Sequence, residues 1–302
     1  MRLSLGPILY LWPRQTIEDF YQQHLNSAVD VIYLGETVCA KRRSLKPAEW
    51  IELAKELSKS GKQIVLSTLA LIEAGSDLGN VKQLCNNGEL LVEANEMGAM
   101  QLMADQRLPF VAGPSLNIYN AYTLKQLHNQ GLIRWVMPVE LNATTLADIL
   151  CDAEKLGIRD NIETEVFSYG RLPLAYSARC FTTRYRNIAK DNCQFVCQDY
   201  PEGLPMDSQE GEAFFNINGI QTQSGRIQHL LSHWQQMQEL GVDLMRISPQ
   251  PQHTGEIIKR YDEVIQSTSQ DTDIQKYLSA PACDGYWRGL SGMDYIPTSE
   301  QH

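Results

Sequence analysis

The sequence predicts an α/β fold, a (β/α)8 TIM-like barrel made irregular by one long cysteine-bearing loop after the seventh strand. Short apolar, β-branched runs alternate along the chain with stretches of helical period, and eight such runs occur within 302 residues. A doubly wound open sheet would show the same alternation. It is disfavoured because no expected strand is followed by a G-x-G-x-x-G turn, and the sequence has no phosphate-binding P-loop.

The expected strands are short apolar runs bounded by turn residues. They lie at residues 2–12, 29–36, 62–70, 89–96, 109–117, 133–141, 161–167 and 242–249. Residues 47–60 have apolar side chains at helical spacing, and Pro47 suits a first helical turn. Residues 227–240 are expected to form another helix, with Leu230, Trp234 and Met237 on one side.

One interval is much longer than the others. Residues 168–226 follow the seventh strand, and the part from Tyr169 to Gly211 has little helical or strand period. Long segments within compact domains are usually functional, and in a barrel they lie at the carboxyl ends of the strands, where the chemistry takes place. We therefore expect one barrel domain over residues 1–302, with 168–226 as an elaborated loop.

The composition excludes several classes of protein. A hydrophobic fraction of 43% supplies a core, and a net charge of −10 argues against binding nucleic acid through bulk electrostatics. The longest apolar stretches are shorter than the roughly 20 residues that cross a bilayer. The run from Leu3 to Trp12 resembles a signal peptide but is followed by Pro13-Arg14, with no small-residue cleavage site. We expect a cytoplasmic protein with its seven cysteines reduced or bound to metal.

Three cysteines fall within the long loop. Cys193 and Cys197 form a C-x3-C pair, which on a helical turn would face one way, and Cys180 precedes them. Thiolates so placed suit zinc or an iron–sulfur cluster, and the spacing leans toward a cluster because zinc knuckles more often use C-x2-C. Cys39 lies just past the second strand, on the same expected face, and is the candidate fourth ligand.

The surroundings of these cysteines differ from those of the other three. Cationic side chains that would offset thiolate charge are close in sequence, namely Arg42, Arg43, Arg179, Arg184 and Arg186. Cys85, Cys151 and Cys283 are expected to be small buried hydrophobic residues, as most cytosolic cysteines are.

Polar residues recur at the ends of the expected strands. If they point toward one mouth of a barrel, they could bind a small polar substrate, although strand ends are also polar simply because they are wet. These residues are Glu36, Glu93, Asn95, Glu96, Asn117, Glu140, Asn142, Glu165, Tyr169 and Arg171.

Two further patterns are expected to be structural. His229 and His233 lack the Glu that a metalloprotease helix needs directly after its first His, so a pair on a helix surface is expected. In the C-terminal segment, Trp287 and Tyr295 are expected to be anchors that pack on the barrel or on a partner. No G-x-S-x-G nucleophile elbow is present.

The segment EVFSYGRLPLAYSARCFTTRYRN, residues 165–187, contains an E-x-F-x-x-G core formed by Glu165, Phe167 and Gly170. It resembles the signature of the collagenase-like peptidase family of unknown catalytic type, although the Cys that the family commonly places after the Gly is absent. Together with GETVCAKRR around Cys39 and C-x12-C-x3-C, it resembles a branch of that family that acts in anaerobic ubiquinone biosynthesis. The resemblance extends to about Met293.

The resemblance implies a [4Fe–4S] cluster held by four cysteines, which correspond to Cys39, Cys180, Cys193 and Cys197. It implies a heterodimer with a second family member, UbiU, and a UbiT-like lipid-binding accessory protein. Such a pair supports hydroxylation of the quinone ring without O2, with an organic oxygen donor such as prephenate, and is not a protease. The alternatives are a protease-like hydrolase of the same family and a zinc-binding scaffold.

Overall fold

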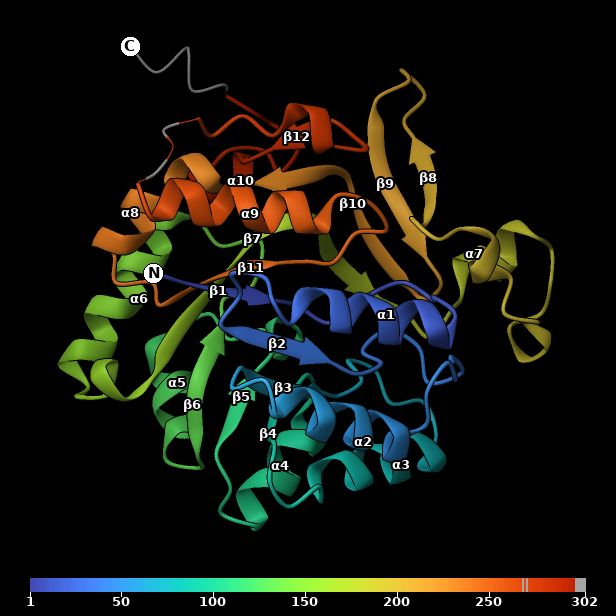
Figure 1. Cartoon of the computed structure of the whole chain (residues 1–302), viewed down its shortest axis with the longest axis horizontal. Helices are drawn as coiled ribbons and strands as arrows, with labels where there is room; N and C mark the ends of the chain where they lie inside the picture. Colours follow the sequence, from blue (N-terminus) through green and yellow to red (C-terminus); the bar gives the residue numbers. More distant parts are fainter. Residues whose placement is uncertain (268, 270, 297–302) are drawn as a thin grey trace.

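Parallel strands close into a barrel in the computed structural model of the chain, which describes residues 1–267, 269 and 271–296 (Figure 1). The barrel strands are β1 (Arg2–Leu5), β2 (Val31–Leu34), β3 (Gln63–Ser67), β4 (Leu91–Ala94), β5 (Phe110–Ala112), β6 (Leu132–Val136), β7 (Glu163–Tyr176) and β11 (Leu244–Ile247). Each pairs in parallel with the next, and β11 pairs with both β7 and β1, which closes the barrel. The expected (β/α)8 fold is confirmed.

Helices cover the outside of the barrel. They are α1 (Arg14–His24), α2 (Pro47–Ser58), α3 (Gly75–Cys85), α4 (Met97–Asp105), α5 (Ala121–His128), α6 (Ala143–Lys155), α8 (Trp234–Glu239) and α9 (Thr254–Ile265). Side chains near the strand ends begin several of them. Pro47 opens α2, and the Asn142 side chain accepts a hydrogen bond from the Thr145 backbone N–H at 2.7 Å, which caps α6. In the described part of the chain, no helix is both long and apolar enough to span a membrane.

The interval 168–226 contains more regular structure than its sequence indicates. β7 continues past the barrel to Tyr176 and pairs antiparallel with β10 (Gln221–His229), which pairs with β9 (Ala213–Asn218), itself paired with β8 (Leu204–Asp207). The short helix α7 (Phe181–Tyr185) and two 3-10 turns, η3 (Lys190–Asn192) and η4 (Val196–Asp199), lie between β7 and β8. Residues 177–220, called the excursion below, project from one end of the barrel (Figure 1).

The expected helix over 227–240 is wrong in its first half. Ile227 belongs to β10, where it pairs with Arg171 of β7, and α8 begins only at Trp234. The apolar spacing was misleading because it runs through a strand end, a 3-10 turn and a helix in succession. The expected surface pair of histidines is therefore wrong too: His229 is buried on β10 with a ring nitrogen 3.4 Å from the Tyr261 hydroxyl, and the ring of His233 lies 3.1 Å from an Asp284 carboxylate oxygen.

The C-terminal segment packs on the chain's own barrel. It contains β12 (Ala282–Cys283), which pairs with β10, and the short helix α10 (Gly285–Arg288). Trp287 is buried in the main core, and its indole N–H donates to the Gln236 side chain on α8 at 2.8 Å, whereas Tyr295 is half-buried. Residues 297–302 of the expected domain lie outside the described residues.

The barrel interior holds buried ion pairs, in which Arg246 contacts both Glu165 and Glu93. Glu165 of β7 is fully buried and accepts hydrogen bonds from Arg246 Nε of β11, from Ser4 Oγ and from the Tyr33 hydroxyl. Arg246 Nη1 also lies 2.8 Å from Glu93 Oε1 of β4. Burial, the largest single effect, acts to raise the pKa of Glu165, but the charges of Arg246 and Arg134 outweigh it and lower that pKa below its usual value.

We expect Glu165→Gln to lower the free energy of unfolding by about 3–5 kcal/mol, because it leaves a buried guanidinium short of its counter-charge. The check is urea denaturation followed by circular dichroism. The matched control is Glu18→Gln on α1, whose carboxylate pairs with the half-exposed Arg14; it should cost about 1 kcal/mol or less.

The same pair predicts a pH dependence. Because the folded pKa of Glu165 lies below the unfolded value of about 4.3, its stabilisation is complete above that value and is lost as the pH falls through the folded pKa. The difference between wild type and Glu165→Gln should therefore shrink below about pH 4. A difference that persists at low pH would contradict the assignment of the ionised form.

Candidate functional site

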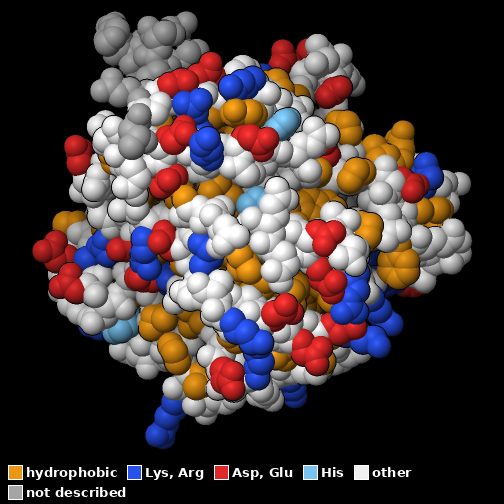
Figure 2. All heavy atoms as spheres, in the orientation of Figure 1, with side chains coloured by type: hydrophobic (Ala, Val, Ile, Leu, Met, Phe, Trp, Pro, Cys, Tyr) orange, Lys and Arg blue, Asp and Glu red, His pale blue; other side chains and the backbone are white. Residues whose placement is uncertain are grey.

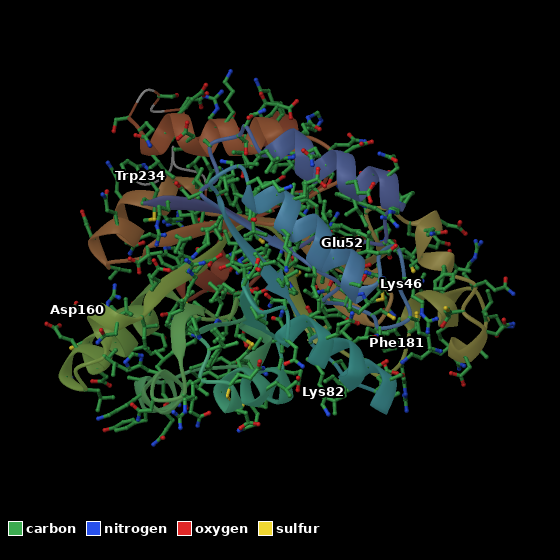
Figure 3. All side chains as sticks on the ribbon, turned by 60° about the horizontal axis from the view of Figure 1, so that its bottom comes forward. Lys46, Glu52, Lys82, Asp160, Phe181 and Trp234 are labelled. Carbon is green, nitrogen blue, oxygen red and sulfur yellow. The ribbon has the colours of Figure 1, made fainter. Side chains whose placement is uncertain are left out.

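The structure brings all four predicted ligand cysteines to one end of the barrel. Cys39 lies in the loop after β2, Cys180 directly precedes α7, and Cys193 and Cys197 lie at η3 and η4; all four are half-buried. Cys39 and Cys180 pack against the same small apolar cluster of Leu9, Val38 and Ile220. In Figure 3, the labelled Phe181, which follows Cys180, and Lys46, which precedes α2, lie at the end opposite Asp160.

Short-range hydrogen bonds position the loop that carries Cys39. Glu36 Oε1 accepts from the backbone N–H groups of Val38 and Cys39 at 2.9 and 3.0 Å, which holds the turn. Lys41 Nζ donates to the Lys190 carbonyl at 3.0 Å. The loop after β2 is therefore tied directly to the segment that leads into Cys193, although β2 and β7 are not neighbours in the barrel.

A buried arginine lies between the two cysteine-bearing segments. Arg42 donates from Nη1 to the Leu9 carbonyl at 2.7 Å and from Nη2 to Asn218 Oδ1 at 2.6 Å. Its Nε is buried and has no hydrogen-bond partner among the described residues, and its charge acts on the thiols of Cys39 and Cys197. Of the five arginines expected to offset thiolate charge, Arg42 is buried and the other four are exposed, with Arg186 paired to Asp199.

Burial dominates the acidity of two of these thiols. It raises the pKa of Cys39 to about 11, against which the Arg42 charge acts in the opposite direction. It also raises the pKa of Cys197, again with Arg42 opposing. The charge of Cys180 contributes to both increases, which places Cys180 near Cys39 and Cys197. The expectation that nearby cations lower the thiol pKa is therefore right in direction for Arg42, but burial raises the pKa by more.

The four cysteines and Arg42 have the donor chemistry of a site that holds an anionic thiolate-bound metal centre. Within the described residues, no three of His, Cys, Asp and Glu stand close enough together to hold a single metal ion. Cys39 and Cys180 pack on one apolar cluster, and the Arg42 charge acts on Cys39 and Cys197. The unpartnered Arg42 Nε–H is a hydrogen-bond donor suited to a thiolate or sulfide acceptor. The fit rests on the four donors and this buried cation.

Cys193 and Cys197 do not lie on one helical turn, the arrangement in which both sulfurs would face one way. Gln194 and Phe195 both have left-handed backbone angles, with φ of 49° and 55°, so two separate 3-10 turns flank a kink. A helix would need all three intervening residues in the right-handed region.

The remaining cysteines agree with expectation in two of three cases. Cys85 at the end of α3 and Cys283 on β12 are buried, and burial raises the pKa of each to about 12. Cys151 is exposed on α6, which corrects the expectation that it is buried. It faces outward because α6 buries Ile149, Leu150 and Ala153 instead.

The ten polar residues at the strand ends do not share one mouth, contrary to that interpretation. Glu96 and Asn142 cap helices, Glu36 holds the Cys39 turn, Arg171 donates to backbone carbonyls at Ser224 and Gly225, and Asn117 and Glu140 are exposed. Glu93 and Asn95 line a cavity at the barrel mouth. Glu165 lies deeper in the barrel, and Tyr169 lines a separate small cavity.

The E-x-F-x-x-G segment builds the barrel mouth rather than the cysteine site. Glu165 accepts a hydrogen bond from Arg246 Nε, and Phe167 lines the mouth cavity. Gly170 has φ +126°, and a Cβ there would lie 2.6 Å from the Ser248 Cβ, so both the backbone angle and the close approach require glycine. The motif therefore fixes how β7 meets β11 at the cavity.

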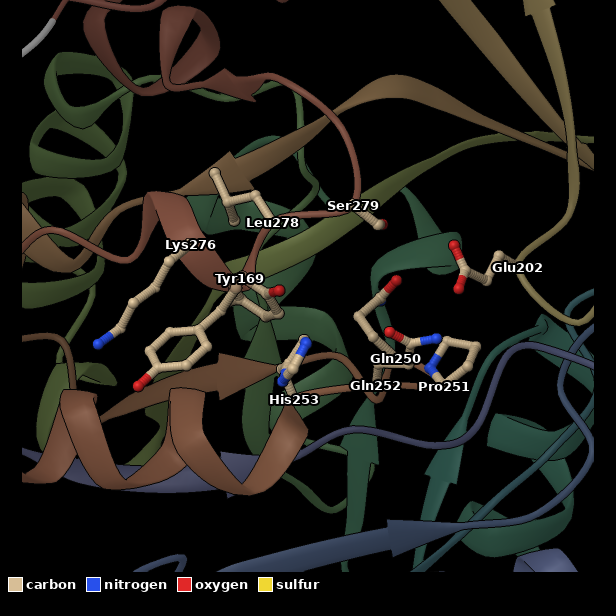
Figure 4. A pocket seen from close by; sticks show the side chains of 10 residues that line it. Tyr169, Glu202, Gln250, Pro251, Gln252, His253, Lys276, Leu278 and Ser279 are labelled. Carbon is tan, nitrogen blue, oxygen red and sulfur yellow. The ribbon is translucent and has the colours of Figure 1, made fainter.

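A second cavity, of about 80 Å³, lies nearby between the β11–α9 connection and residues 276–279 (Figure 4). His253, Lys276 and Glu202 border it, the last contributed by the excursion. Its enclosed volume admits a few water molecules.

Sequence reasoning missed three residues of the mouth: Arg246, Thr37 and Ser248. Arg246 carried a usable signal, since an arginine in the middle of the apolar strand VDLMRISP must be paired if that strand is buried. Thr37 and Ser248 carried none, because a single hydroxyl at a strand end is ordinary.

A family model described as peptidase family U32 matches residues 17–291. A curated relative, an uncharacterised protease of Methanocaldococcus jannaschii, is 26% identical over 176 residues, which cover 56% of this chain and 42% of that protein. The chain thus spans less than half the length of that relative.

Solved structures give similar folds at low identity. A U32 peptidase is 11% identical with a TM-score of 0.44, covering 83% of this chain and 94% of that one. The dihydropteroate synthase of Stenotrophomonas maltophilia is 10% identical with a TM-score of 0.45, covering 88% and 93%.

We expect the exposed Cys151 to be alkylated first among the three cysteines outside the candidate site. At pH 8, a thiol with a pKa of about 12 has a thiolate fraction on the order of 1 in 10,000, and Cys85 and Cys283 are also shielded by packing. The check is iodoacetamide labelling with peptide mass spectrometry over time. Labelling of Cys85 as fast as Cys151 would contradict the burial described.

Proposed function

The chain belongs to peptidase family U32, and from that premise we propose that it is a UbiV-type protein. Its function would be that of an iron–sulfur subunit required for oxygen-independent ubiquinone biosynthesis, supporting hydroxylation of the quinone ring together with UbiU. The observation that supports this proposal is that segments far apart in sequence carry Cys39, Cys180, Cys193 and Cys197 to the same end of the barrel. Cys39 and Cys180 pack on one apolar cluster, and Lys41 bonds to the segment that leads into Cys193.

The cofactor of the proposal is a [4Fe–4S] cluster held by these four cysteines. Ligation by four thiolates leaves no vacant iron, so such a cluster supplies one-electron transfer, or braces the excursion, rather than activating a substrate directly. The chain's own residues supply the surroundings. Arg42 places a buried positive charge beside the thiols, and Glu36 holds the Cys39 turn.

The excursion also offers a surface for the proposed partner. Five large hydrophobic side chains along it are at least 39% exposed: Phe181, Tyr185, Phe195, Met206 and Phe214. Figure 2 shows hydrophobic side chains at the surface on the side where β8 and β9 lie. Aromatic and methionine side chains are typical of protein interfaces, which supports a heterodimer with UbiU, with a UbiT-like protein as the lipid-binding accessory.

The test of the cofactor is iron and sulfide content after anaerobic purification, with a visible absorption spectrum. Wild type should be brown with about four irons and four sulfides per chain. Each of Cys39→Ala, Cys180→Ala, Cys193→Ala and Cys197→Ala should lose most of this iron, because three thiolates hold a cubane cluster poorly. Cys151→Ala is the matched control and should keep it.

The test of the pathway uses cells that lack the gene for this chain. Wild type and Cys151→Ala should restore ubiquinone during anaerobic growth, and Cys193→Ala should not. A colourless protein that holds zinc would instead favour the zinc-binding scaffold. Peptide cleavage that survives cysteine alkylation would favour the hydrolase. Either result would overturn the proposal.

A further inference from the structure

Four buried polar side chains surround one small cavity at the barrel mouth. They are Thr37, Glu93, Arg246 and Ser248, each no more than 3% exposed. Thr37 Oγ1, Arg246 Nη2 and Ser248 Oγ have no hydrogen-bond partner among the described residues. Glu93 Oε1 lies 2.8 Å from Arg246 Nη1 but accepts no aligned hydrogen bond.

So many unpartnered atoms in one place are unusual. Leaving a buried polar group without a partner costs about 1–3 kcal/mol, and each exception in a folded protein calls for a reason. Here the four groups come from the β2–α2 loop, from β4, from β11 and from the residue that follows β11. They converge on a single cavity, so a shared ligand accounts for all of them at once. That is the pattern of a polar binding site, not of isolated packing faults.

The charges of the site favour an uncharged ligand. Arg246 is already paired with Glu165 at 2.6 Å and with Glu93 at 2.8 Å, and its guanidinium lies over the Tyr33 ring. Its remaining Nη2 can therefore donate a hydrogen bond, but little net positive charge is left to hold an anion. An oxygen that accepts from Arg246 and donates to Glu93 satisfies both, and a hydroxyl group does so.

The walls above this polar floor favour a flat apolar body. Phe167, Pro173, Tyr176 and Pro114 line the cavity, and the last three are only half-buried, so they form its rim. The enclosed volume is about 30 Å³, enough for a hydroxyl group but not for a ring. A ring would therefore lie between the rim residues with its hydroxyl in the enclosed part.

The cavity and the candidate cysteine site share a wall. Leu9 and Tyr176 both line the cavity, and both belong to the apolar cluster against which Cys39 and Cys180 pack. A ring at the rim would therefore contact side chains that belong to the same cluster as these cysteines.

We propose that the barrel mouth binds the hydroxyl group of an uncharged phenolic ring through Arg246, Glu93, Thr37 and Ser248. This inference rests on the proposed function, in which a quinone precursor is the substrate, and it assigns the site on this chain where the ring is held.

The test is binding of phenol to the anaerobically purified protein by ligand-observed saturation-transfer NMR titration. Anisole and benzoate are titrated as analogues: anisole lacks the O–H donor, and benzoate carries a charge. Phenol should bind best. Ser248→Ala and Thr37→Val should each weaken binding by about 3- to 10-fold, the effect of one lost hydrogen bond. Ser168→Ala is the matched control, a buried serine bonded to the Val166 carbonyl at 3.0 Å and outside the cavity; it should bind like wild type.

Equal binding of phenol to wild type and to the correctly folded mouth variants, as judged by circular dichroism, would overturn the inference. Anisole or benzoate binding as tightly as phenol would overturn it too. Iron content separates this result from the proposed function. Variants that keep their iron but lose phenol support the mouth site, and phenol binding by a protein that holds no cluster would refute the cluster while leaving the site intact.

Discussion

The buried pair of Glu165 and Arg246 is the constraint on which the rest of the barrel depends. Leaving either buried charge unpaired would lower the free energy of unfolding by several kcal/mol. The strands β7 and β11 must therefore pair in the register that brings Glu165 to Arg246. The same carboxylate also takes hydrogen bonds from Ser4 on β1 and Tyr33 on β2. A slip of one residue would turn each of these side chains toward the outer apolar layer. Register around half of the barrel is thus fixed by polar contacts at its centre.

The mouth follows from that register along a single strand. In β7, residues two apart face the interior, so fixing Glu165 also turns Phe167 into the cavity, and the shift after Arg246 brings Gly170 against Ser248. β7 then leaves the barrel and pairs with β10, which carries the base of the excursion. Because Cys180 comes only four residues after Tyr176, the end of this one strand also sets where the excursion's first cysteine can lie.

The sequence was sufficient to predict elements that show a local hydrophobic period. It was insufficient for strands that can be recognised only by their pairing with distant segments. The barrel strands were predictable because their apolar runs are buried on both faces. β8 to β10 were not, because their Gln, Asn, Thr and Gly residues, as in Gln221–His229, resemble a loop until β7 is seen to pair with them. The candidate cysteines could be chosen by spacing. The approach of their segments could not be foreseen, because it depends on a lysine contact between segments about 150 residues apart.

The residues that the barrel mouth shares with the surroundings of Cys39 and Cys180 bear on what the proposed cluster could do. Leu9 and Tyr176 line the cavity and also belong to the apolar cluster against which Cys39 packs, so the proposed ring and the proposed cluster would contact the same side chains. Direct ligation of substrate is disfavoured by four thiolates, which complete the coordination of a cubane. An electron can cross packed side chains without direct contact, whereas an oxygen atom cannot be transferred that way. If the chain holds both the proposed cluster and the proposed ring, the cluster can act on the ring only by passing electrons through packed side chains, and the oxygen atom must come from a separate donor.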